Sequence, residues 1–163
     1  MDTLAVQVGA ALKAQGMMLA TAESCTGGGV AQAVTDIAGS SSWFERGFVT
    51  YTNQAKVEML GVRQSTLDAY GAVSEMTVRE MAAGAIAHSH AHISLAVSGI
   101  AGPGGGTPDK PVGTVWFAWA LRHGEVLVQR YQLEGDRASI RSQSVRLALQ
   151  GVLNLLKNQT KTA

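Results

Sequence analysis

The sequence predicts an α/β fold, a three-layer α/β/α sandwich around a mixed, mostly parallel sheet. Two observations indicate this class. Helix-like and strand-like segments alternate through the first part of the chain, which is typical of parallel strands joined by helical crossovers. Two strand-like segments then follow one another directly near the C-terminus, which predicts an antiparallel hairpin. Residues 1–163 are expected to form one domain, because no linker or internal repeat interrupts them.

The first four elements alternate between helix and strand. Apolar residues at helical spacing predict a helix over 3–15, and the apolar run that follows predicts a short buried strand over 17–22. Helical spacing returns over 28–37, and alternating residues predict a strand over 46–52. This order of strand, glycines and helix is typical of a βα turn at a binding edge.

The middle of the chain is predicted to contain two more helices. Asn53 is placed to cap a short helix that ends at Gly61. The stretch 65–74 is turn-like, and its last residue, Ser74, is placed to cap a longer helix over 75–88.

The remaining elements complete the sheet and its outer layer. They are a central strand at 93–98, a Gly- and Pro-rich loop at 99–113, hairpin strands at 114–121 and 125–133, and a helix at 137–157. Asp136 is placed to cap this last helix. The polar tail from about residue 158 is expected to fray.

Composition and charge exclude several classes of protein. Apolar residues make up 46% and charged residues 15% of the chain, as in globular proteins. A net charge of +1 gives no electrostatic footprint for nucleic acid. No apolar run approaches the ~20 residues of a membrane span, and the N-terminus does not resemble a signal peptide. The single cysteine excludes an internal disulfide, so a cytoplasmic protein is expected.

Functional groups are concentrated in three segments. These are TAESCTGGG (21–29), YTNQAK (51–56) and SGIAGPGGGTPDK (98–110). The first and third follow predicted strands, where the sites of open α/β sheets are found. The glycines of 21–29 leave backbone N–H groups free to bind an anion or an oxyanion. The P-loop pattern is absent from this segment.

Ser24 is a candidate nucleophile that would need a base. Three of the four histidines lie in HSHAH (88–92) and the fourth, His123, lies in the hairpin turn. None is next to a glycine-rich turn, so a Ser-His-Asp triad has little support. HSHAH is better explained as a solvated helix end than as a metal site. Cys25 is an alternative nucleophile, because a helix N-terminus lowers a thiol pKa, although a packing role is commoner.

Lys56 is the other candidate base. It lies in the first turn of a predicted helix, where the positive end of the macrodipole disfavours a cation and lowers the lysine pKa. A neutral lysine can accept the proton of a serine. From position alone, however, a solvated surface lysine is the simpler interpretation.

Four segments together resemble one known family. TAESCTGG, GFVTYTNQAKVEMLGV, YGAVSEMTVREMAAGA and AVSGIAGPGGGTPDKPVGTVWFA are similar, in order and spacing, to the CinA C-terminal domain family, and the resemblance extends from about residue 4 to 156. It implies an amidase that converts nicotinamide mononucleotide to nicotinate mononucleotide and ammonia, without a metal or an organic cofactor. The implied ligand is therefore a small-molecule nucleotide.

The resemblance also implies roles for individual residues. Ser24 is expected to be the nucleophile and Lys56 the base, with Tyr51 beside it. Many relatives carry threonine at the position of Ser98, so the hydroxyl is kept here and a methyl contact is lost. The residues expected to bind substrate are Glu23, Cys25, Thr26, Gly27, Gly28, Ser98, Gly99, Gly102 and Arg137.

Each of these groups has an expected task. Backbone N–H groups over 25–28 are expected to hold the oxyanion, and Glu23 is expected to orient Lys56 or a ring nitrogen. Arg137 and the loop 99–106 are candidates for the phosphate. A non-catalytic nucleotide-binding or regulatory domain is the alternative function.

A homodimer is also expected. The resemblance favours it, and so do three aromatic side chains that look exposed in the sequence: Trp116, Phe117 and Trp119.

Overall fold

The computed structural model describes residues 2–162 and contains a five-stranded sheet in the order β2-β1-β3-β4-β5. The strands are β1 (Leu19–Glu23), β2 (Phe44–Val49), β3 (Ile93–Gly99), β4 (Thr114–Leu121) and β5 (Val126–Gln132). The α-helices are α1 (Asp2–Ala14), α2 (Gly29–Thr35), α3 (Asn53–Leu60), α4 (Gln64–Tyr70), α5 (Glu75–Ala87) and α6 (Arg137–Thr162).

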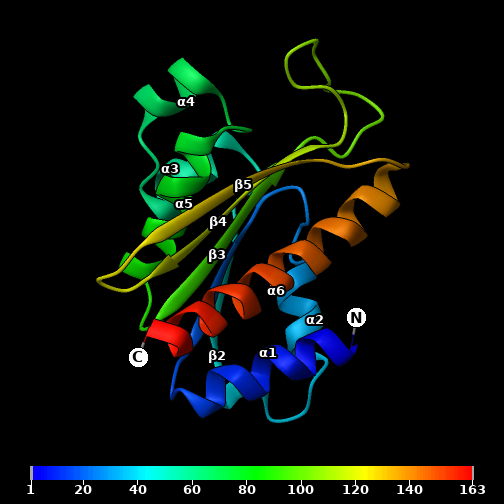
Figure 1. Ribbon diagram of the computed structural model, residues 1–163. Helices are drawn as coiled ribbons and strands as arrows, with labels where there is room; N and C mark the ends of the chain where they lie inside the picture. Colours follow the sequence, from blue (N-terminus) through cyan, green and yellow to red (C-terminus); the bar gives the residue numbers. More distant parts are fainter. Residues whose placement is uncertain (1, 163) are drawn as a thin grey trace.

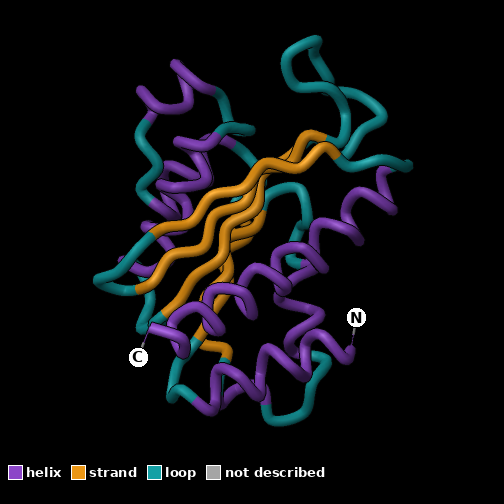
Figure 2. The backbone as a smooth tube through the Cα atoms, viewed as in Figure 1, coloured by secondary structure: helices purple, strands orange, loops and turns teal. Residues whose placement is uncertain are grey.

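The helices cover both faces of the sheet, so the predicted three-layer sandwich is confirmed. Helices α1, α2 and α6 lie on one face, and α3, α4 and α5 lie on the other (Figures 1 and 2). Large side chains such as Leu95 and Phe117 point towards α6. The opposite face carries small residues, which pack against α5: Ala20, Ala22, Ala96, Ala118 and Ala120. These small side chains let α5 lie close to the sheet.

The sheet is mixed in a way that places three strand ends together. Strand β1 pairs in parallel with β2 and with β3, whereas β3 with β4 and β4 with β5 are antiparallel. Strand β5 therefore runs in the same direction as β1, β2 and β3, and only β4 is reversed, so the expectation of a mixed, mostly parallel sheet is confirmed. The carboxyl ends of β1, β2 and β3 meet at one edge, and the 100–113 loop returns to β4 at the same edge.

Most predicted caps are present, and one is displaced. The Ser74 hydroxyl accepts the Thr77 N–H, and the Asp136 carboxylate accepts the Ser139 N–H at 2.9 Å. The cap of α3 is Thr52 rather than Asn53: its hydroxyl accepts the Ala55 N–H at 3.1 Å. Asn53 instead becomes the first residue of the helix.

The stretch predicted as a turn at 65–74 contains helix α4. Its buried side chains are Thr66 and Leu67. The Thr66 hydroxyl donates to Glu80 of α5 at 2.6 Å, so a tertiary contact stabilises a segment that is too short to be helical alone.

The last helix is longer than expected. It continues to Thr162, because no Gly or Pro interrupts it after Gly151 and Leu155 and Leu156 remain buried. The predicted fraying from residue 158 is therefore not observed as a loss of helix. Despite this length, none of the helices within 2–162 combines the length and apolar character that crossing a bilayer requires.

Candidate active site

Ser24 lies on a sharp turn between β1 and α2. The chain reverses directly after it, and the Gly27 N–H donates to the Ser24 carbonyl at 3.0 Å. Gly27 and Gly28 have φ values of 60° and 99°, a backbone conformation that residues with a side chain rarely adopt. The glycines therefore allow the turn that presents Ser24 at the edge of the sheet.

Glu23 shapes this turn from inside the protein. Its buried carboxylate accepts hydrogen bonds from the Thr26 hydroxyl at 2.6 Å and from the N–H groups of Val30 and Ala31 at 2.8 and 3.0 Å. It satisfies the N-terminus of α2, where a negative charge is favourable. The expectation that Glu23 orients Lys56 is therefore wrong. Neither Glu23 nor Thr26 lines the cavity described below.

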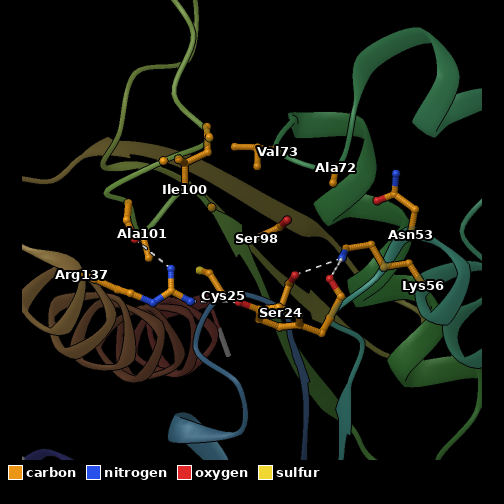
Figure 3. Close-up of a pocket in the computed structure, with 15 residues that line it drawn as sticks. Ser24, Cys25, Asn53, Lys56, Ala72, Val73, Ser98, Ile100, Ala101 and Arg137 are labelled. Atoms are coloured by element: carbon orange, nitrogen blue, oxygen red, sulfur yellow. Dashed lines mark hydrogen bonds between the residues drawn. The ribbon is translucent and has the colours of Figure 1, made fainter.

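Lys56 is buried beside Ser24 rather than exposed. Its side chain is 1% exposed, and its Nζ lies 3.0 Å from Ser24 Oγ (Figure 3). The same Nζ donates to the Thr50 carbonyl at 2.8 Å and to the Tyr51 carbonyl at 3.4 Å. The surface-lysine interpretation is excluded by this burial.

This environment brings the neutral form of the lysine within reach of neutral pH. Burial lowers the pKa of Lys56 from 10.5 to about 8. A neutral amine has two N–H donors and one lone pair. The donors match the carbonyls of Thr50 and Tyr51, and the lone pair is then free to accept the proton of Ser24. The arrangement can therefore act as a nucleophile and base pair.

The pKa of the Cys25 thiol is raised, whereas a reactive thiol has a lowered pKa. Burial raises its pKa from 9.0 to about 11, so at neutral pH it is a thiol and not a thiolate. The lowering expected at a helix N-terminus is outweighed by this desolvation. Ser24 is the better candidate nucleophile.

A cavity of about 270 Å³ opens above Ser24 and Lys56. One wall is the loop after β3, and the opposite wall is the connection between α4 and α5 (Figure 3). Its lining is Ser24, Cys25, Tyr51, Asn53, Lys56, Ala72, Val73, Ser98, Gly99, Ile100, Ala101, Gly102, Gly104, Gly105 and Arg137. The Ser98 hydroxyl has no hydrogen-bond partner within residues 2–162 and is available to a ligand.

The Gly99 N–H points towards Cys25. The Ile100 N–H donates to the Thr114 carbonyl at 2.9 Å on the β4 side of β3, and N–H directions alternate along a strand. Gly99 therefore faces the β1 side, as Val97 does when its carbonyl accepts the Ser24 N–H at 3.0 Å. This N–H also lowers the thiol pKa of Cys25, although burial outweighs it.

Arg137 joins two walls of the cavity. Its Nη1 donates to the Gly102 carbonyl at 2.8 Å, and its Nη2 donates to the Tyr51 hydroxyl at 3.0 Å. The Tyr51 hydroxyl is thus held by Arg137, while Lys56 contacts Ser24 directly. A proton relay through Tyr51 is not needed for this pair to react.

The structure adds two residues that sequence reasoning missed. Asn53 lines the cavity because it begins α3 instead of capping it. Arg141 lies one helical turn after Arg137 and donates to the carbonyls of Cys25 and Thr26. The spacing of the two arginines was the available signal, because residues four apart share one face of a helix.

The histidine-rich segment makes structural contacts away from this cavity. His92 Nδ1 accepts the Met18 N–H at 2.9 Å, and His88 Nδ1 lies 2.9 Å from the Gly84 carbonyl. Over the described residues, His, Cys, Asp and Glu side chains form no group of three or more that could hold a metal ion.

Known proteins share both the sequence and the fold. The family model of the CinA C-terminal domain matches residues 1–156. Nicotinamide-nucleotide amidohydrolase PncC of Enterobacter agglomerans is 56% identical over 95% of each chain, and that of Escherichia coli K12 is 58% identical over 90% of this chain and 89% of its own. The crystal structure of the competence/damage inducible protein CihA from Agrobacterium tumefaciens superposes with a TM-score of 0.93, at 48% identity over 94% of both chains.

Proposed function

Because the chain belongs to the CinA C-terminal domain family, we propose that it hydrolyses the carboxamide of nicotinamide mononucleotide to nicotinate mononucleotide and ammonia. The observation that carries this proposal is the contact of 3.0 Å between Lys56 Nζ and Ser24 Oγ in a buried site. The names of the relatives at 56% and 58% identity support the same substrate. The reaction belongs to pyridine nucleotide salvage, in which NAD precursors are recovered.

The first step forms an acyl-enzyme. Neutral Lys56 takes the proton of Ser24 as Oγ attacks the carboxamide carbon. When the tetrahedral intermediate collapses, its C–N bond breaks and Lys56 returns the proton to the departing ammonia. Water then attacks the acyl-enzyme with Lys56 again as base, which releases the nicotinate product and regenerates Ser24.

Two backbone N–H groups are the candidates to hold the oxyanion. The Ser24 N–H and the Gly27 N–H already donate to carbonyls, so they are not available. The N–H groups of Cys25 and Gly99 belong to residues that line the cavity. A donor in such a position stabilises the transition state by about 3 kcal/mol. This assignment replaces the 25–28 set expected from the sequence.

The nucleotide is proposed to lie under the 99–106 loop. Arg137 is the cation on the cavity wall that suits the phosphate, and a guanidinium binds phosphate oxygens through two parallel hydrogen bonds. The Ser98 hydroxyl is placed to bind a polar group of the substrate.

Ammonia release from nicotinamide mononucleotide tests the proposal directly. Ser24→Ala and Lys56→Ala are each expected to lower the rate by at least about 10³-fold, since each removes one member of the reacting pair. Unchanged thermal melting shows that each variant is folded. Activity that survives in Ser24→Ala and is lost in Cys25→Ala supports a thiol nucleophile instead. A wild-type protein that melts higher with the nucleotide but releases no ammonia is a binding domain, which is the alternative function.

We also propose that the protein is a cytoplasmic homodimer. The family resemblance and the unpaired Cys25 support this assignment. The aromatic argument for a dimer does not, because Phe117 and Trp119 are core residues, stacked with ring centroids 5.7 Å apart. Light scattering coupled to size-exclusion chromatography measures the mass of the protein in solution. A monomeric mass at micromolar concentration contradicts the dimer.

A further inference from the structure

We infer that Arg141 is a positioning residue, whose guanidinium holds the Cys25–Thr26 and Thr26–Gly27 peptide groups, just after Ser24, in the geometry that acyl transfer requires. The inference rests on the proposed function, because it assigns Ser24 as the nucleophile. It concerns a side chain of α6 that does not line the cavity.

The guanidinium spans the nucleophile turn. Its Nε donates to the Cys25 carbonyl at 3.1 Å, and its Nη2 donates to the Thr26 carbonyl at 3.3 Å. The planar, pre-organised fork of an arginine can hold two neighbouring carbonyls at once, which a lysine cannot do. These two hydrogen bonds fix the turn to helix α6.

The turn needs such a tie because its own sequence is flexible. Gly27 and Gly28 follow Thr26 directly, and glycine loses more conformational freedom on folding than any other residue. A Cβ at Gly27 would lie 3.4 Å from Arg141 Nη2, so the guanidinium packs directly against this glycine. The tie therefore acts on the part of the turn with the least steric restraint.

Holding these carbonyls also sets the direction of the N–H groups. The C=O and N–H of a trans peptide point in opposite directions. The Cys25 carbonyl shares its peptide plane with the Thr26 N–H, so the bond to Arg141 fixes that plane directly. The same bond restricts rotation about the Cα–C bond of Cys25, and through it the placement of the Cys25 N–H beside the nucleophile. A displacement of about 1 Å at a reacting group can cost about 10²-fold in rate.

The charge of Arg141 is directed at the same turn. Salt bridges among the described residues do not include Arg141 or its neighbour Arg137. Its positive charge is therefore not neutralised by a paired carboxylate, and it favours negative charge that develops near Cys25. The same charge opposes the rise in the pKa of the Cys25 thiol.

Two substitutions and a matched control test the inference. Arg141→Gln removes the charge and the fork, and Arg141→Ala leaves room for a free guanidinium ion. Arg146→Gln is the control, because Arg146 lies exposed on the same helix. We expect kcat of Arg141→Gln to fall about 10- to 100-fold with KM changed less than about threefold, and Arg146→Gln to match the wild type. Millimolar guanidinium chloride is expected to restore part of the kcat of Arg141→Ala, whereas sodium chloride at equal ionic strength is not.

The outcomes separate positioning from a structural role. A lower melting temperature with unchanged kcat, a change confined to KM, or no rescue by guanidinium overturns the inference. If the wild type releases no ammonia, the proposed substrate is wrong, and the rate at which a fluorophosphonate labels Ser24 becomes the measurement. Labelling at least about tenfold slower in Arg141→Gln supports positioning. Equal labelling rates, or a wild type that is not labelled, overturn it.

Discussion

Replacement of Lys56 by methionine should change how the stability of the protein depends on pH. Lys56 is 1% exposed, and burial lowers its pKa from 10.5 to about 8. That difference corresponds to roughly 3 kcal/mol of penalty for holding a charged amine in the folded protein. Methionine has a similar length and carries no charge, so the variant lacks this penalty.

The sign follows from which state holds the proton. Below pH 8 the folded and unfolded proteins both carry a charged lysine, and the full penalty destabilises the fold. Between about pH 8 and 10.5 the folded protein has released the proton and the unfolded chain still binds it, so stability rises with pH. Above 10.5 both states are neutral and no penalty remains.

Urea unfolding of both proteins at a series of pH values measures the effect. From pH 7 to 10.5 the wild type should gain roughly 3 kcal/mol of unfolding free energy relative to Lys56→Met. The lost hydrogen bonds to Thr50 and Ser24 offset the two curves by a nearly constant amount and leave their divergence unchanged. Lys13→Met, at an exposed site on α1, is the control and should run parallel to the wild type. Parallel curves for Lys56→Met would refute the assignment of a desolvated lysine.

Three further predictions concern the rate, the thiol and the packing of α5. The kcat/KM for ammonia release should rise about tenfold per pH unit below pH 7.5 and level off above about 8, because the base is neutral above its pKa; a flat profile from pH 6 to 9 contradicts this. Cys25 should react with iodoacetamide at pH 8 at least about 100-fold more slowly in the folded protein than in urea, and equal rates by mass spectrometry would contradict its burial. Gly84→Ala should lower the unfolding free energy by about 2 kcal/mol or more, because the new Cβ collides with the Leu60 carbonyl, whereas Gly104→Ala, which meets open space, should stay within about 0.5 kcal/mol.

Local signals in the sequence were sufficient for most elements of the fold. Gly61 ends α3 with φ 71°, and the caps at Ser74 and Asp136 stand where their residue types predicted them. Helix α4 was not predicted, because the hydrogen bond from Thr66 to Glu80 that stabilises it joins two different helices. The pattern of a single segment carries no information about such a contact.

The candidate site was predictable in its residues but not in its energetics. Resemblance pointed to Ser24 and Lys56, while helical position alone favoured an exposed lysine. The burial of Lys56 depends on the turn after β1 and on the chain after β2, whose groups surround Nζ only in the tertiary structure. The role of Glu23 could have been predicted from the sequence, since a carboxylate near a glycine-rich helix start commonly binds the free N–H groups there.

The cavity divides its tasks between separate stretches of chain. Ser24 follows β1 and Lys56 lies on α3, whereas the wall formed by the loop after β3 belongs to a segment whose part 103–109 is exposed. Changes in that loop can therefore alter which amide is accepted while the chemistry stays the same. The substrate selectivity of this fold can thus be changed separately from its reacting pair. Varying the residues of 103–109 is the most direct route to amidases of altered selectivity.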